Sequence, residues 1–395
     1  MTAIQLNPAA AHGNAVHGAL DSLHVSVVDD AVGFASLRTE WHQLLASSRA
    51  DGLFLTWEWL YTWWRHLGRG RRLFVVTVRR GSTLIAVAPL TMTRTSPVPV
   101  SSLEFVGSGT VGSDYLDFIV HRDHEASAFE ALANFLAGTG VALRLPSVTE
   151  DSCIASVFAP MLVERGWQRR DVAMQVCPYI DLSTASWDSY LASVGPSHRY
   201  NFRRRLRNLQ KSYDVRLERV EGEGDRHEAL GQVVDLHLRR WNHRGGSDAF
   251  HDDRIIAFHD EFSAIARDHG WLRLRVLTID RRPVAAFYGF RYHDKYCFYQ
   301  SGFDEAFVRE SIGLVMIGLT IKEAIEERAV EYDFLHGDEP YKFLWAREAR
   351  PLWRIELYPP GMLGRLHRRG VLALASTKKA IKRAMKRESG SCSAR

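Results

Sequence analysis

Two pairs of strand-like segments with similar sequences place the strongest constraint on how this chain can fold. The first pair, Leu73–Val78 and Leu84–Thr91, surrounds a short turn-forming run. The second pair, Leu272–Ile279 and Val284–Tyr292, surrounds a turn that ends in Pro283 and has a similar apolar pattern. Apolar runs of this length on either side of a turn are typical of β-hairpins. We therefore predict a divergent tandem repeat with one such hairpin in each half.

The rest of the chain alternates between helical and strand-like patterns. Apolar residues at helical spacing predict helices at 34–45, 54–64, 126–136, 154–165, 187–194, 198–211, 227–241 and 254–269. Strand-like runs predict further strands at 24–28, 115–120, 141–145, 172–176, 295–302 and 330–335. This order predicts an α/β chain of the α+β type, in which each half is a mixed, mostly antiparallel sheet flanked by helices. We expect a mobile leader (1–20), two domains (21–178 and 179–358) and a basic amphipathic tail (359–395).

Composition and charge exclude several classes of protein. The 395 residues are 46% hydrophobic and 25% charged, which is typical of a globular protein. The net charge of +5 comes from the tail, where ten Lys/Arg face one Asp/Glu, so a basic nucleic-acid-binding body is not expected. The four cysteines are scattered without a zinc-binding spacing, and we predict no metal site. Neither a secretory signal nor a membrane span is recognisable, so we expect a cytoplasmic protein.

The stretch Tyr332–Trp345 contains the highest concentration of side chains that could act in catalysis or binding. A strand-like run ends at His336 and Gly337, and Asp338 is placed to cap a helix with Pro340 in its first turn. Strand, turn and helix in this order gather side chains at one sheet edge. Those side chains are Asp333, His336, Asp338, Glu339, Tyr341 and Lys342. The alternative interpretation is an ordinary capped helix with a solvated cluster of charges.

A second chemical feature precedes that stretch. Ser311 is placed to cap a helix, and the apolar residues on one face of that helix predict that this face is buried. The first backbone N–H groups of an α-helix have no hydrogen-bond partner inside the helix. With the positive end of the helix dipole, these groups can bind a pyrophosphate. The predicted cofactor-binding residues are Arg309, Ser311, Ile312, Gly313 and Leu314. The glycine-rich run Gly107–Gly112 does not lead into a helix, so we interpret it as a loop rather than a phosphate site.

Three motifs together resemble a known family. They are Tyr299-Gln-Ser-Gly-Phe-Asp304, the helix start at Ser311, and Tyr332-Asp-Phe-Leu-His-Gly-Asp-Glu-Pro-Tyr-Lys342. This succession resembles the GNAT-like acetyltransferases of the CelD/BcsL type from cellulose biosynthesis, which are related to the Fem-type aminoacyl transferases. The resemblance covers about Leu23–Tyr358, although Ile312 and His336 stand where the family usually has proline and arginine.

The resemblance implies two GNAT-like domains, of which the second binds acetyl-CoA or another acyl-CoA. The acceptor would be an amine or hydroxyl of a small molecule or saccharide. Asp338 or His336 would act as the base and Tyr341 would protonate the leaving thiolate. Lys342 would neutralise an anionic group, Asp333 would form a wall of the site, and Tyr299 and Gln300 would contact substrate.

Two basic segments leave alternatives open. The helix predicted at 198–211 is rich in arginine, which is typical of a solvated face but also fits the 3′-phosphate of CoA or a tRNA. The tail repeats Lys378, Lys382 and Lys386 at helical spacing, which allows either a solvated helix or a peripheral membrane contact. Two rival functions follow: an aminoacyl-tRNA-dependent transferase of Fem type, and a non-catalytic scaffold of a polysaccharide synthase.

Overall fold

A computed structural model describes residues 22–95, 100–109, 111–242, 249–362 and 364–373. The predicted leader and the tail lysines lie outside these residues, while 364–373 are helical. The N-terminal half contains β1 (Leu23–Val28), α1 (Ala31–Ser36), α2 (Arg38–Ala46), η1 (Leu53–Leu55), α3 (Trp57–Leu67), β2 (Arg72–Arg80), β3 (Thr83–Thr95), β4 (Val100–Phe105), β5 (Ile119–Val120), η2 (Arg122–His124), α4 (Glu125–Thr139), β6 (Ala142–Val148), η3 (Ile154–Phe158), α5 (Ala159–Glu164) and β7 (Gln168–Asp181). The C-terminal half contains α6 (Trp187–Ser193), α7 (Pro196–Ser212), β8 (Val215–Arg219), α8 (Glu223–Asn242), α9 (Asp253–Asp268), β9 (Leu272–Ile279), β10 (Arg282–Tyr292), β11 (Lys295–Phe303), η4 (Glu305–Phe307), α10 (Ile312–Glu326), β12 (Glu331–Asp333), η5 (Lys342–Leu344) and β13 (Glu348–Tyr358).

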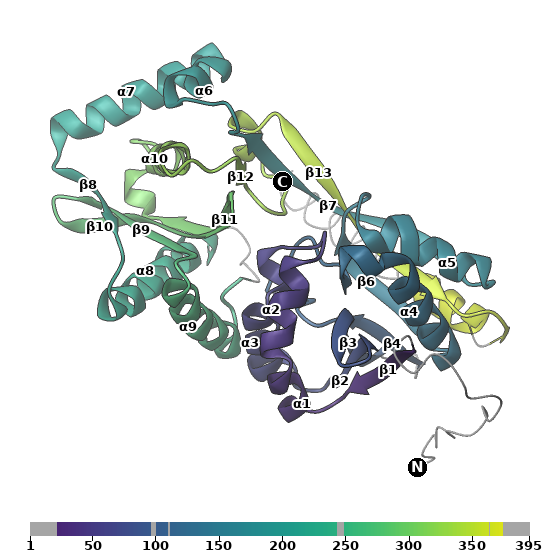
Figure 1. The fold of residues 1–395 in the computed structure, drawn as a ribbon. Coiled ribbons are helices and arrows are strands. Elements are labelled where there is room, and N and C mark those ends of the chain that lie inside the picture. The colour runs from purple at the N-terminus through teal and green to yellow at the C-terminus, as the bar shows by residue number, and fades with distance from the viewer. Residues whose placement is uncertain (1–21, 96–99, 110, 243–248, 363, 374–395) are drawn as a thin grey trace, which may run out of the picture.

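The strands of both halves join one 13-stranded sheet with the order β1-β2-β3-β4-β6-β13-β7-β12-β11-β10-β9-β8, to which β5 adds by pairing with β3. Read inward from its two ends, the sheet repeats the same arrangement of four outer strands followed by a parallel neighbour. The last strand of each half then crosses over: β7 pairs with β12, and β13 pairs with β6. Figure 1 shows two lobes that β7 and β13 connect. The mixed α/β fold class is therefore confirmed, and the predicted domain boundary at 178/179 falls within β7.

Each half contains one pair of neighbouring parallel strands, β4 with β6 and β11 with β12. Parallel neighbours require a crossover connection, and each connection contains a helix of 15 residues, α4 or α10. The β11–β12 pairing covers only Lys295–Cys297 opposite Glu331–Asp333, whereas β11 continues to Phe303. The two strands therefore separate after Cys297, and the next residues of β11, Phe298–Gln300, line a cavity.

Two apolar cores hold these elements together. The larger core contains the tryptophans of α2 and α3 and extends to α8 and α9, and the second surrounds α6, α7 and α10. Trp59 of α3 is fully buried and packs edge-on against Phe258 and Phe262 of α9, with ring centroids 4.9 and 4.7 Å apart. Helix α3 begins at Trp57 rather than at position 54, because the Thr56 side chain caps it by accepting a hydrogen bond from the Trp59 N–H. The aromatic helix of the N-terminal half thus anchors the C-terminal half.

Local structure departs from the sequence-based expectations in several places. The helix expected at 34–45 is split into α1 and α2, and the strand expected at 115–120 is reduced to β5 because Tyr115 has a positive φ of 58°. The helix expected to begin at Asp338 is wrong, since only the short η5 forms and Tyr341 precedes it. Strands β8 and β13 were not expected. In β13 the central Pro351 argues against a strand locally, yet it pairs with Val176 of β7.

Candidate active site

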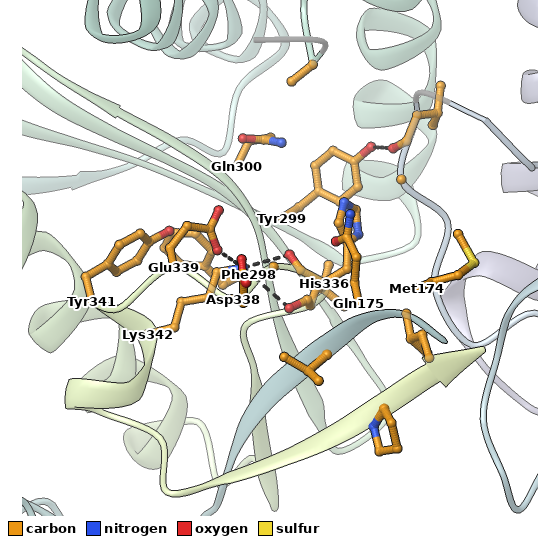
Figure 2. Close-up of a pocket in the computed structure, with 18 of the residues that line it drawn as sticks. Met174, Gln175, Phe298, Tyr299, Gln300, His336, Asp338, Glu339, Tyr341 and Lys342 are labelled. Atoms are coloured by element: carbon orange, nitrogen blue, oxygen red, sulfur yellow. Dashed lines mark hydrogen bonds and ion pairs between the residues drawn. The ribbon is translucent and has the colours of Figure 1, made fainter. Parts of the chain in front are cut away.

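Three cavities follow one another along the junction of the two halves. The central cavity, about 660 Å³, is lined by the end of β11, the 335–342 segment, β7 and β13 (Figure 2). The α10 cavity, about 370 Å³, lies at the start of α10 and shares Tyr341 with the central cavity. The arginine cavity, about 270 Å³, lies on the other side and shares His336 with the central cavity.

His336 is held by a carboxylate from the other half of the chain. Its Nδ1 lies 2.9 and 3.0 Å from the two oxygens of Asp114, and its backbone N–H donates to Asp114 Oδ2 at 2.9 Å. Because an ionised carboxylate only accepts, Nδ1 carries the proton and Nε2 is left as the acceptor. Asp114 is only 2% exposed, and its negative charge raises the pKa of His336. The pair has the composition and geometry of an oriented general base.

The loop that carries Asp114 is shaped to approach His336 closely. Gly112 has a φ of +72°, and a Cβ atom there would lie 2.6 Å from His336 Cε1. The same loop is fixed on both sides of Asp114: the Tyr299 hydroxyl donates to the Val111 carbonyl, and the Tyr115 hydroxyl donates to Asp333 at 2.6 Å. Only glycine fits at position 112, because a side chain would be strained and would displace the imidazole.

The other polar residues of the 335–342 segment differ from one another in burial and in contacts. Asp338 is exposed and lines the central cavity, but it caps no helix. Lys342 is buried, and its ammonium donates to the His336 carbonyl at 2.7 Å and lies 3.0 Å from Glu339 Oε2 (Figure 2). These contacts give Lys342 a role in holding the turn that presents His336.

Asp333 does not join this group. It is buried, accepts hydrogen bonds from the Tyr115 hydroxyl and the Leu335 N–H, and lines a separate cavity of about 460 Å³ together with Asp117. Burial raises the pKa of Asp333 to about 6. By contrast, Tyr299 and Gln300 of β11 both line the central cavity, as a substrate-contacting role requires.

The start of α10 borders the α10 cavity. The N–H groups of Ile312, Gly313 and Leu314 have no partners within the helix, and all three residues line the cavity. Ser311 has a positive φ of 58° and makes no side-chain cap, so the predicted capping role is wrong. A Cβ atom on Gly313 would lie 3.1 Å from the Phe303 ring, so a side chain at this position would press against that ring.

The two remaining predicted residues flank this cavity. Arg309 is exposed, does not line the cavity, and accepts a hydrogen bond on its carbonyl from Arg205 of α7 at 2.6 Å. Tyr341 lines both the α10 cavity and the central cavity, and burial raises the pKa of its hydroxyl, so this group stays protonated at neutral pH. The structure therefore brings together His336, Asp338, Tyr341, Tyr299 and Gln300 around one cavity.

Sequence reasoning missed Asp114 and Gly112. Gly112 ends the glycine-rich run 107–112 and Asp114 follows it; this run gives the only local signal, and by itself it predicts a loop. The position of His336 is 222 residues further along the chain, so the contact depends on the crossover of β7 and β13. Among the described residues, no group of three or more His, Cys, Asp and Glu side chains is arranged to hold a metal ion. No helix in the described ranges is long and apolar enough to cross a membrane.

Comparisons with known proteins agree on the fold. Residues 196–343 match the family model of the acetyltransferase (GNAT) domain. No curated protein sequence matches the chain. The chain is similar to the solved structure of FemX, with a TM-score of 0.58 and 12% identity over 82% of this chain and 96% of that chain. A conserved protein of unknown function from Bacteroides thetaiotaomicron has a TM-score of 0.54 and 10% identity over 85% and 99% of the two chains.

A third structure extends this set. It is the C-terminal domain (DUF2156) of an Agrobacterium fabrum protein described as a lysylphosphatidylglycerol synthetase, with a TM-score of 0.50 and 12% identity over 82% of this chain and 92% of that chain. At such low identities these structures establish a shared fold. The family match over residues 196–343 identifies an acyltransferase domain of the GNAT superfamily, and these residues include every predicted site residue. Asp114 and Gly112, which lie against His336, are outside the matched range.

Proposed function

We propose that this protein transfers an acyl group from acetyl-CoA or another acyl-CoA to an amine or hydroxyl of a small-molecule or saccharide acceptor. The observation that carries the proposal is the His336–Asp114 pair, which faces a cavity that continues to the start of α10. A general base at one cavity and an anion-binding helix start at the adjoining cavity are the two parts that direct acyl transfer requires.

The α10 cavity would hold the cofactor. The pyrophosphate would accept hydrogen bonds from the N–H groups of Ile312, Gly313 and Leu314, where the helix dipole favours negative charge. The unpaired edge of β11 after Cys297 would pair with the amides of the pantetheine arm as an added strand. This direction leads the thioester past Tyr341 and into the central cavity.

The reaction would then need one base and one acid. His336 Nε2 would take the proton from the acceptor nitrogen or oxygen as that atom bonds to the thioester carbonyl carbon, and the carbon–sulfur bond would break. The Tyr341 hydroxyl would give a proton to the leaving thiolate, because burial keeps it protonated. Asp338 is the second candidate for the base, since it lines the same cavity but is exposed.

Titration calorimetry of the full chain tests the cofactor. Saturable heat with acetyl-CoA or a longer acyl-CoA is expected, and His336→Gln should leave that affinity unchanged because the imidazole lies away from the helix start. An absence of heat with every acyl-CoA would overturn the proposal. Co-purified ligands identified by mass spectrometry would then name the acyl chain and the acceptor.

A second function is favoured by α7. Its exposed face carries Arg203, Arg204 and Arg207, and the overall fold is shared with FemX, so an aminoacyl-tRNA could replace acyl-CoA as the donor. A salt-sensitive gel shift with charged tRNA, without heat from acyl-CoA, would favour this alternative. The resemblance to the CelD/BcsL type supports a cytoplasmic place in polysaccharide biosynthesis, as an enzyme or, if neither donor binds, as a scaffold.

A further inference from the structure

The arginine cavity has no part in the chemistry described so far. Guanidinium groups of Arg71, Arg144 and Arg354 line it, and it adjoins the central cavity at His336. We propose that this cavity binds an anionic group of the acceptor, a phosphate or a carboxylate, and so positions the nucleophile of the acceptor at His336. The inference rests on the proposed function for the identity of the ligand as acceptor.

The charges of this cavity form a row across the sheet. Arg144 of β6 lies opposite Glu356 of β13, and Glu356 lies opposite Arg170 of β7. Arg354 stands two residues before Glu356, so its side chain is on the same face of β13. Glu104 of β4 lies 3.4 Å from Arg144. Four neighbouring strands thus present one continuous charged surface.

Positive charge is in excess within this surface. Glu104 lies 3.4 Å from both Arg71 and Arg144. Glu356, which is fully buried, lies 2.8 Å from Arg170 and Arg354 and 3.8 Å from Arg144. The three arginines that line the cavity thus share Glu104 and the buried Glu356, which Arg170 also contacts, while the other acidic side chain at the cavity, Asp114, is paired with His336. An added anion would restore the balance of charge.

The arginines are held in place before any ligand arrives. Arg71 is packed over the Trp63 ring, with 5.3 Å from its guanidinium carbon to the ring centroid. Arg354 Nε donates to Glu356 Oε1 at 2.8 Å. A guanidinium carries five N–H groups, so these contacts orient the group and still leave donors for a ligand. The surface is thus preorganised for an oxyanion.

Two buried polar atoms at the cavity lack a hydrogen-bond partner among the described residues. They are the Ser108 hydroxyl oxygen and Arg144 Nε, and Ser108 is only 6% exposed. A buried hydroxyl without a protein partner is costly, and this one lies beside the cavity, so it is available to donate to a ligand bound there. A phosphate or carboxylate oxygen accepts from both groups.

The order of the three cavities determines how the acceptor would be oriented relative to the donor. Met174 and Gln175 line both the central and the arginine cavities, and Figure 2 shows them on the His336 side, away from Tyr341. Tyr341 lies on the side that opens to the start of α10. The donor and the anionic end of the acceptor would therefore enter from opposite ends and meet between Tyr341 and His336.

The test is titration of the full chain, saturated with CoA to occupy the cofactor site, with inorganic phosphate and separately with acetate at constant ionic strength. Saturable binding of at least one anion is expected, and the preferred anion distinguishes a phosphorylated acceptor from a carboxylated one. The double variant Arg71→Gln/Arg354→Gln should weaken that binding about tenfold or more, because it removes two charge-assisted donors. Ser108→Ala, a smaller change, should weaken it about threefold.

Arg170→Gln is the matched control, because Arg170 also contacts Glu356 but does not line the cavity. Its anion affinity should stay within about twofold of the wild type. Absence of saturable anion binding, or equal binding by the double variant and the wild type, would overturn the inference. If CoA itself does not bind but anion binding depends on Arg71 and Arg354, the proposed function fails while the anion site stands.

Discussion

The two parallel strand pairs occupy equivalent places in the two halves, yet the helices that connect the strands of each pair begin differently. Helix α10 begins with Ile312 and Gly313 and has no acidic residue in its first turn. Helix α4 has the same length, but Glu125 lies in its first turn. A carboxylate at a helix start repels a phosphate, whereas free N–H groups with a glycine attract one. We therefore infer that, of these two helix starts, the one in the C-terminal half is better suited to an anionic ligand.

In the N-terminal half, the chain between β4 and α4 contributes to the site through Asp114 rather than through a helix start. Residues 111–117, which lie between β4 and β5 in the chain, bring Asp114 to His336. The segment is fixed internally, because Trp59 Nε1 donates to Ser113 Oγ at 2.8 Å and Ser113 Oγ donates to the Gly107 carbonyl at 2.7 Å. Under the proposed function, the C-terminal half therefore offers the donor site, while the N-terminal half orients the base and supplies Arg71 and Arg144 to the arginine cavity. Variants in each half can break or sharpen this division.

The largest effect is expected from His336→Gln. Removing the general base should lower kcat by about 10²- to 10⁴-fold with little change in acyl-CoA affinity, since the imidazole acts on the acceptor. Steady-state kinetics with an identified acceptor, combined with calorimetry of the cofactor, measures both quantities. Retention of more than half of kcat would remove His336 from the mechanism.

Asp114→Asn should have the next largest effect. The Asp114 charge raises the pKa of His336, and the base acts in its neutral form, so activity rises with pH through that pKa. The variant should lower the pKa of His336, move this acidic limb of the kcat/KM profile to lower pH, and reduce the maximum about 10- to 100-fold through lost orientation. An acidic limb at the wild-type pH would contradict the pairing and assign the limb to another group.

Gly313→Val and Ala126→Val compare the two helix starts directly. Both positions are second in their helices, and Ala126 is exposed. Valine at 313 would push against the Phe303 ring and block approach to the backbone, so the KM for acyl-CoA should rise about tenfold. Ala126→Val should leave it within about twofold. Equal effects of the two substitutions would show that the halves do not differ in cofactor binding.

The smallest effect is expected from Asp338→Asn. Asp338 is exposed and makes no helix cap, so kcat should fall less than about threefold if His336 is the base. The comparison with His336→Gln under identical conditions decides between the two candidates. A loss of about 100-fold or more would instead make Asp338 the base, because that is the loss general-base removal produces.

Part of the site could be predicted because its signals are local. The apolar run before His336, the glycine after it and the small residue at the start of α10 are readable from spacing, and they located His336, Tyr341 and Gly313. Local capping rules failed at Ser311 and Asp338, where the chain turns through positive φ at Ser311 and Leu335 instead of forming side-chain caps. Around Asp338, the Lys342 side chain instead holds the turn by donating to the His336 carbonyl.

The sequence by itself determined the repeated hairpins, the α/β class and the two chemical segments around 311 and 336, because periodicity and turn residues act over a few positions. Only the tertiary structure decided which carboxylate orients His336, and which arginines lie beside it. Asp114 and His336 are 222 residues apart, and Arg71, Arg144 and Arg354 come from separate strand regions. They meet because β7 and β13 exchange between the halves and merge the two sheets into one, a long-range pairing that no local pattern specifies.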